Sequence, residues 1–252
     1  MSTGEGQTEI REFGEILSSA IDGHLPLLVG GHAVNLWAHL LIRGHLATEL
    51  EKRDLLPLTS KDLDLYGDIR LLTELSRRFG GTVVLSTERS MMVGRLEVEL
   101  AGIMRKIEVL RDVRGITTKE LENSWMPVEF DNHLIRVPLP PVLLKAKLAN
   151  AAHIDQTDRN DVRHVKIMIL VVREYLMKIV LGIEAKEIDP PRVGVIALES
   201  TLEIVSSYDA GRCHKLHGID FTEIWPREVL VAAQSPPIAN FVKHRLPAID
   251  QP

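Results

Sequence analysis

Two short segments in the first quarter of the chain combine glycines and carboxylates in a pattern that suits phosphate and metal chemistry. Residues 28–33 (LVGGHA) predict an apolar strand that turns at Gly30-Gly31 into a helix. A glycine turn before a helix N-terminus presents backbone N–H groups that favour phosphate. Residues 60–65 (SKDLDL) predict a strand in which Asp62 and Asp64 share one face, because residues i and i+2 of a strand point the same way.

Two carboxylates this close repel each other unless something compensates their charge. They are tolerated at neutral pH when a divalent cation lies between them or when both are fully solvated. An edge strand with both acids in water is therefore the alternative for Asp62 and Asp64, and an ordinary tight turn is the alternative for the two glycines. A phosphate site and a metal site together indicate nucleotide chemistry.

A third acidic residue lies in the middle of a later predicted strand, 105–110. Alternation places Glu108 on the face opposite to the apolar Ile107 and Val109. A solvent-facing strand position is the simpler interpretation of Glu108. Basic residues flank it and predict a basic rim near this site: Arg105, Lys106, Arg111 and Arg114.

Apolar periodicity predicts an α+β protein in which a mixed sheet with flanking helices is followed by a helical part. The expected helices are 10–21, 31–45 and 68–79, and the expected strands are 25–29, 62–66, 82–86, 93–100, 105–110 and 132–137. Pro138, Pro140 and Pro141 mark a boundary, so the predicted domains are 9–137 and 138–252. The second contains predicted helices at 142–152, 159–181 and 192–207, and an irregular tail from Gly211 with one short helix.

Composition limits the classes of protein that fit. The chain has 252 residues, 45% of them hydrophobic, which suffices for one large or two modest domains with real cores. A net charge of −5 gives no global attraction to nucleic acid or membrane. One cysteine, a polar segment 1–7 and no long apolar run predict a cytoplasmic protein that has no disulfide, signal peptide or membrane span.

The order of these motifs resembles the nucleotidyltransferase superfamily that includes DNA polymerase β. The closer likeness is to the AbiEii-type branch of type IV toxin–antitoxin systems. The residues that carry this likeness are Gly30-Gly31-His32-Ala33-Val34, then Ser60-Lys61-Asp62-Leu63-Asp64-Leu65, a helix over 140–148 that begins with prolines, and Arg159-Asn160-Asp161. The likeness covers about residues 25–175. It implies a nucleotidyltransferase core that is followed by a helical segment.

The resemblance also implies roles for particular residues. Asp62, Asp64 and Glu108 form the catalytic and metal-binding set for Mg²⁺ or Mn²⁺. Relatives often carry Asp at the third position, so Glu108 is open between metal ligand, general base and bystander. The nucleotide-binding residues are Gly30 and Gly31, Ser60 and Lys61, and Lys145 or Lys147, of which at most one lysine enters the site because they do not share a helix face.

The expected activity is transfer of a nucleoside monophosphate from an NTP to a hydroxyl, with release of pyrophosphate. The acceptor is left open between RNA or tRNA, a small molecule and a protein, and an antitoxin-like partner is possible. The alternative is a non-catalytic nucleotide- or protein-binding module on the same scaffold. The enzymatic interpretation depends on the expectation that the three carboxylates meet at one point facing the glycine turn.

Overall fold

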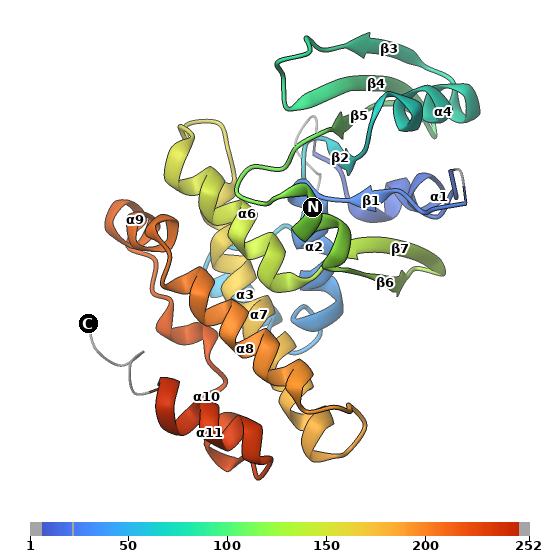
Figure 1. Ribbon diagram of the computed structural model, residues 1–252. Coiled ribbons are helices and arrows are strands. Elements are labelled where there is room, and N and C mark those ends of the chain that lie inside the picture. The colour runs from blue at the N-terminus through green and yellow to red at the C-terminus, as the bar shows by residue number, and fades with distance from the viewer. Residues whose placement is uncertain (1–6, 22, 247–252) are drawn as a thin grey trace. The chain divides into compact units, whose positions relative to one another are not determined.

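The computed structural model describes residues 7–21 and 23–246, and it divides into two compact units, 1–146 and 147–252. The division falls inside one helix, whereas the sequence places a boundary at 137/138. Most of the polar segment 1–7 lies outside the described residues. The N-terminal unit carries the sheet and the C-terminal unit is helical (Figure 1).

The N-terminal unit is built on a mixed seven-stranded sheet in the order β3-β4-β5-β2-β1-β7-β6. The pairs β2–β5 and β1–β7 are parallel, and the other neighbours are antiparallel. The strands are β1 (Leu27–Leu28), β2 (Leu63–Tyr66), β3 (Thr82–Leu85), β4 (Met92–Leu100), β5 (Ile103–Leu110), β6 (Trp125–Phe130) and β7 (His133–Pro138). The predicted mixed sheet with flanking helices is confirmed.

Short helices surround this sheet. They are η1 (Ile10–Phe13), α1 (Gly14–Leu17), α2 (Gly30–Leu41), α3 (Ala47–Lys52), α4 (Ile69–Phe79) and α5 (Thr118–Asn123). Helix α4 packs on β3, β4 and β5, α2 packs on β2, and α1 packs on β7 (Figure 1). The carboxylate of Asp68 caps α4 by accepting hydrogen bonds from the backbone N–H groups of Arg70 and Leu71.

The two faces of the central strands differ in polarity. Leu63 and Leu65 of β2 and Ile107 and Val109 of β5 are fully buried on one face. The intervening residues Asp64, Tyr66, Glu108 and Leu110 are half-buried on the other face. Because side chains alternate along a strand, burying the apolar set fixes the register and leaves the polar set on a partly open surface.

The pairing of β1 with β2 brings the start of α2 beside the start of β2. Leu28 pairs with Leu65 in the antiparallel register, and the N–H of Val29 donates to the carbonyl of Asp64 at 3.0 Å. Helix α2 begins at the next residue, Gly30. Two motifs that are about thirty residues apart in the sequence are thereby neighbours in the sheet.

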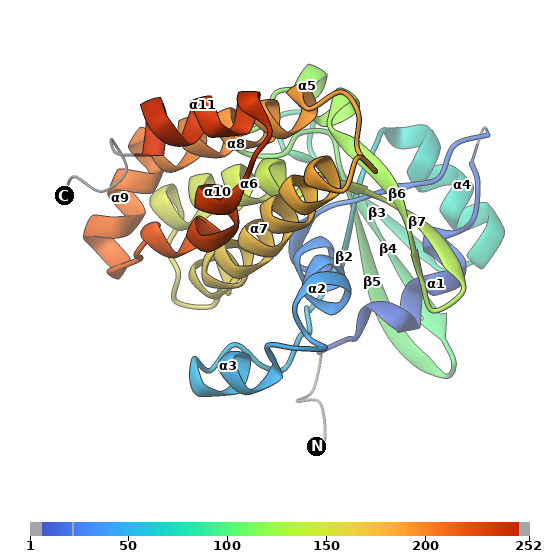
Figure 2. The same ribbon diagram turned by 90° about the horizontal axis from the view of Figure 1, so that it is seen from below.

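The C-terminal unit packs its helices around α7 (Figure 2). The helices are the end of α6 (Pro140–His153), α7 (Asp161–Glu184), α8 (Arg192–Val205), α9 (Tyr208–His217), η2 (Thr222–Ile224), α10 (Arg227–Ala232) and α11 (Pro236–Arg245). Helix α7 contacts α8, η2 and α10, and α11 contacts α8 and α10. Most of α7 is buried, which explains its long apolar sequence.

The predicted helix 10–21 is wrong in length. Its α-helical part ends at Leu17, because the hydroxyls of Ser18 and Ser19 donate to carbonyls one turn back and compete with continued helix. The predicted strand 132–137 pairs with a strand that the sequence analysis missed, β6. Strand β6 contains Pro127 and lies at the edge of the sheet, where proline is tolerated.

The expectation of an irregular tail after Gly211 is also wrong. Helix α9 starts where Ser207 accepts a hydrogen bond from Ala210 N–H, and it runs beyond Gly211. Pro236 and the proline after it occupy the first positions of α11, where the missing N–H costs nothing. These two prolines therefore start a helix. Among the described residues, no helix combines the length and apolar character needed to cross a membrane.

Candidate active site

The glycine turn contacts one of the predicted carboxylates directly. Gly30 has a φ of +69°, a left-handed conformation that glycine adopts without strain. A Cβ built on Gly30 would overlap the carboxylate of Asp64 and would lie 2.7 Å from Asp64 Cβ. Only a residue without a side chain fits, so the turn backbone and the Asp64 side chain lie against each other. The next residue, Gly31, is buried in the first turn of α2.

Asp64 and Glu108 are brought together by strand pairing. They are direct partners in the parallel register of β2 and β5, and both are half-buried on the polar face. Neighbouring strands are about 4.8 Å apart, so these two carboxyl-bearing side chains start from adjacent backbone positions. Residues about forty-five positions apart in the sequence therefore supply two acidic side chains on adjacent strands, and one of them, Asp64, lies against the glycine turn.

Asp62 lies outside the regular strand. It occupies a bend directly before β2, where it is half-buried, and the neighbouring Lys61 is exposed. Within the part of the chain that the structure describes, no group of three or more His, Cys, Asp or Glu side chains has the arrangement of a metal site. The structure therefore pairs Asp64 with Glu108 and does not gather Asp62 with them into a closed cage.

Magnesium suits this donor set in a specific way. Mg²⁺ usually binds one or two carboxylates and completes its octahedron with water and substrate phosphates, and rarely uses an all-protein cage. Carboxylates beside the N-terminus of α2 fit an ion that is completed by a phosphate ligand. The assignment of Mg²⁺ or Mn²⁺ stays a prediction.

A buried hydrogen-bond network links the first turn of α2 to the segment before β2. The imidazole of His32 is fully buried on α2, and its Nε2 lies 2.8 Å from the hydroxyl oxygen of Thr8. The Thr8 hydroxyl also donates to the carbonyl of Ser60 at 2.8 Å, and the backbones of Thr8 and Ser60 exchange hydrogen bonds. Burial lowers the pKa of His32 to about 3, so the ring is neutral at pH 7. This network ties α2 to the segment that leads to Asp62.

The two candidate phosphate-binding lysines have different partners. Lys145 Nζ lies 2.7 and 2.9 Å from the two carboxylate oxygens of Glu120 on α5, within the N-terminal unit. Lys147 is buried in the C-terminal unit and donates to Asp161 Oδ1 at 3.0 Å. Arg159 donates to the other oxygen of Asp161 at 2.7 Å. The separate partners agree with the expectation that the two lysines do not share a helix face.

Burial by itself raises the pKa of Asp161. The adjacent Lys147 and Arg159 outweigh that effect and lower its pKa to about 2. Asp161 is therefore ionised at neutral pH and holds Lys147 in one orientation. A role of either lysine in binding phosphate stays a prediction.

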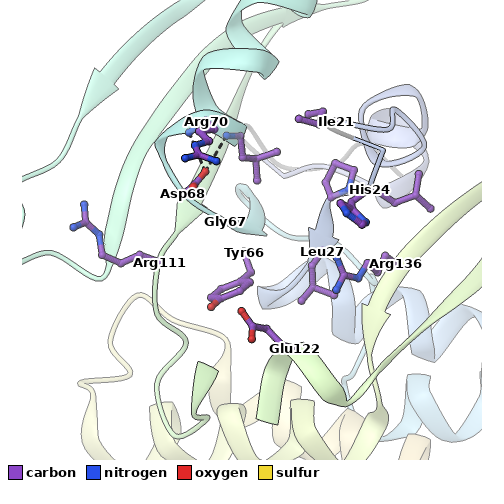
Figure 3. Close-up of a pocket in the computed structure, with 13 residues that line it drawn as sticks. Ile21, His24, Leu27, Tyr66, Gly67, Asp68, Arg70, Arg111, Glu122 and Arg136 are labelled. Atoms are coloured by element: carbon purple, nitrogen blue, oxygen red, sulfur yellow. Dashed lines mark hydrogen bonds between the residues drawn. The ribbon is translucent and has the colours of Figure 1, made fainter. Parts of the chain in front are cut away.

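A cavity of about 460 Å³ lies on the polar face of the sheet, toward the ends of β2 and β5 (Figure 3). Of the basic residues expected near the site, Arg111 lines this cavity. Arg70 and Arg136 line it too and escaped the sequence analysis, because they come from α4 and β7 and no local motif joins them. Arg105 pairs with Glu12 instead.

Comparison with known proteins adds little to this geometry. No protein-family model matches the sequence, and no curated protein matches it. Among solved structures, the chain is similar to an antigenic nucleotidyltransferase-like protein from Paracoccidioides brasiliensis. The identity is 14%, the match covers 56% of this chain and 78% of the other, and the TM-score is 0.31. A similarity at this level assigns no function, so the site is interpreted from its own residues.

Replacing His32 tests the buried network. Between pH 6.5 and about 3 the unfolded chain binds a proton at this imidazole and the native protein does not, so native stability falls as the pH decreases through this window. Relative to His32→Gln, the wild type should lose about 1.4 kcal/mol per pH unit below 6.5. Urea unfolding at pH 7, 5.5 and 4.5 measures this, with the exposed His244→Gln as control. Parallel pH dependences of wild type and His32→Gln would refute a buried neutral imidazole.

Replacing Asp161 tests the ion pair. Asp161→Asn leaves Lys147 buried without its counter-charge and should reduce the free energy of unfolding at pH 7 by about 3 kcal/mol. The stabilisation by the ionised carboxylate is complete above its unfolded pKa of 3.8 and is lost as the pH falls through about 2. The deficit should therefore be about 1 kcal/mol smaller at pH 3 than at pH 7.

The exposed Asp158→Asn is the matched control for this measurement, and it should unfold like the wild type at both pH values. A deficit of Asp161→Asn that is small at pH 7, or that does not change with pH, would contradict the buried ion pair.

Proposed function

We propose that this protein is a nucleotidyltransferase that transfers a nucleoside monophosphate from an NTP to a hydroxyl acceptor, with Mg²⁺ or Mn²⁺ as cofactor. The observation that carries the proposal is the contact between the Gly30 backbone and the Asp64 carboxylate. A phosphate-binding turn and a carboxylate that binds a cation can act on one ligand only when both face the same phosphate group. The register of Asp64 with Glu108 adds the second carboxylate at that point.

Each residue has a distinct task in the proposed reaction. The backbone of Gly30-Gly31 and the N-terminus of α2 bind the triphosphate. Asp64 and Glu108 would hold the cation, and a role for Asp62 in the preceding bend stays a prediction from the sequence. When bound, such a cation neutralises phosphate charge and stabilises the departing pyrophosphate. Ser60 and Lys61 contribute to nucleotide binding beside this group.

The bond changes follow from this placement. The acceptor hydroxyl oxygen forms a bond to the α-phosphorus, and the bond from that phosphorus to the bridging oxygen of the β-phosphate breaks. Pyrophosphate leaves with that electron pair. Glu108 accepts the hydroxyl proton if it acts as general base, for which its half-buried position beside Asp64 is suited.

The finer parts of the proposal concern acceptor and biology. RNA, including tRNA, a small hydroxylated molecule and a protein side chain are the three acceptor classes. The most specific version of the proposal is that the protein belongs to the AbiEii-type toxin branch, has an antitoxin-like protein partner and is cytoplasmic. It depends on the sequence motifs at Gly30-Gly31 and 60–65.

The test measures transfer of label from α-³²P-labelled NTPs in the presence of Mg²⁺. The wild type should label an acceptor from a panel of tRNA, aminoglycosides and a casein-type protein, and should release pyrophosphate. Asp64→Asn should reduce the rate by about a hundredfold or more, since it removes one of the paired carboxylates beside the phosphate. Asp54→Asn is the control, because Asp54 is exposed in the loop after α3.

Equal transfer by wild type and Asp64→Asn would show that the active site is assigned wrongly. Calorimetry with NTP and Mg²⁺ on the same proteins distinguishes the remaining case. Nucleotide binding that is lost in Asp64→Asn, without any product in the wild type, would identify a non-catalytic nucleotide-binding module.

A further inference from the structure

The position of Asp62 is not fixed by the sheet. The pairing of β2 with β5 begins at Leu63, so Asp62 lies in the bend before the first paired residue. Asp64 differs, because it lies within the paired strand and against the Gly30 backbone. If the carboxylate of Asp62 is to act together with that of Asp64, contacts outside the sheet must hold the backbone at Asp62 in place.

Thr8 anchors the segment before Asp62. The backbones of Thr8 and Ser60 form an antiparallel bridge, in which Thr8 N–H donates to the Ser60 carbonyl at 2.8 Å and Ser60 N–H donates to the Thr8 carbonyl at 3.1 Å. The Thr8 hydroxyl donates a third hydrogen bond, 2.8 Å long, to the same Ser60 carbonyl. Thr8 is buried, which shields these bonds from water. Only residues 61 and 62 separate this anchor from the fully buried Leu63, so the backbone between them has little freedom.

His32 connects the anchor to the helix that begins at the glycine turn. A hydroxyl carries one hydrogen, and that of Thr8 points to the Ser60 carbonyl, so the Thr8 oxygen accepts from the Nε2–H group of His32 at 2.8 Å. Burial lowers the pKa of His32 to about 3, so the ring is neutral, with its hydrogen on Nε2 and a lone pair on Nδ1. His32 is the third residue of α2 and follows Gly30 by two positions.

Histidine is a costly residue for this environment. Within the part of the chain that the structure describes, Nδ1 of His32 is buried and has no hydrogen-bond partner. The ring of Phe13 packs edge-on against the imidazole, with centroids 5.3 Å apart. An apolar side chain would fill such surroundings without burying an unsatisfied nitrogen. What histidine adds is one N–H donor at the end of a rigid ring, and that donor reaches Thr8.

We infer that Thr8 and His32 are positioning residues of the candidate site, which hold the Ser60–Asp62 segment at a fixed distance from the N-terminus of α2. Both side chains are buried, so they act through the Ser60 backbone and do not touch the nucleotide. This inference rests on the proposed function. It adds that the contribution of Asp62 to cation binding depends on the hydrogen bonds among Thr8, His32 and Ser60.

The affinity for a cation–nucleotide complex tests the inference without requiring turnover. The probe is Mn²⁺ with α,β-methylene-ATP, which cannot be cleaved at the α-phosphate, and calorimetry measures its binding to the full chain. Thr8→Val keeps the shape of the side chain and removes its hydroxyl. It should weaken binding about tenfold, as is usual when a group that orients a metal ligand is lost. His32→Leu should have the same effect.

Conservative variants separate positioning from packing. Thr8→Ser keeps the hydroxyl, and His32→Gln keeps an N–H donor near the place of Nε2, so both should bind the probe like the wild type. Thr201→Val is the matched control, because it removes the hydroxyl of another fully buried threonine, in the C-terminal unit. It should leave the affinity unchanged. Circular dichroism and thermal unfolding establish that each variant is folded.

A double-mutant cycle identifies the residue through which the network acts. Asp62→Asn should weaken binding of the probe. In the Asp62→Asn background, Thr8→Val should then cause no further loss, because the carboxylate that the network positions is gone. A general loosening of the fold would weaken binding equally in both backgrounds. If Thr8→Val does not fold, the comparison of His32→Leu with His32→Gln in the two backgrounds gives the same information.

The outcomes separate this inference from the proposed function. Wild-type affinity in Thr8→Val and His32→Leu, or an undiminished loss in the Asp62→Asn background, would overturn the inference. Asp64 and Glu108 would then remain the proposed cation ligands. A wild type that neither binds the probe nor transfers label would refute the proposed function and the inference with it.

Discussion

The candidate site depends on one close approach, that of the glycine backbone to the Asp64 carboxylate. The antiparallel pairing of β1 with β2 places Val29 opposite the Asp64 peptide, and the left-handed Gly30 then turns the chain into α2. Any side chain at Gly30 would overlap Asp64. The fold therefore brings a positive helix terminus and a negative side chain into contact, and the proposed metal-bound phosphate would interact with both.

Burial of the opposite face of the sheet fixes the strand register that places Asp64 against the glycine turn. Leu63, Leu65, Ile107 and Val109 are fully buried, so a register slip of one residue would move them to the polar face and expose them. The same alternation that builds the core fixes Asp64 beside Glu108 and, one row further, Tyr66 beside Leu110. The carboxylate pair and the arginine-lined cavity thus share one face because the core occupies the other.

Sequence patterns predicted what depends on local order and missed what depends on distant partners. Alternating and helical periodicity located most strands and the long helices, and the motifs at Gly30-Gly31 and Asp64 pointed to the candidate site. The edge strand β6, which contains Pro127, was missed, and the tail after Gly211 was predicted to be irregular although two prolines start its helix α11. Arg70 and Arg136 meet at one cavity only through the strand order, which no local pattern encodes.

A crystal structure with Mn²⁺ and a non-hydrolysable NTP analogue tests the central claim most directly, because the anomalous signal locates the ion without ambiguity. The account predicts Mn²⁺ bound by the carboxylates of Asp64 and Glu108, with the triphosphate against the backbone of Gly30-Gly31. A nucleotide and ion bound elsewhere in the chain, with the glycine turn and the Asp64–Glu108 pair free of both, would contradict it.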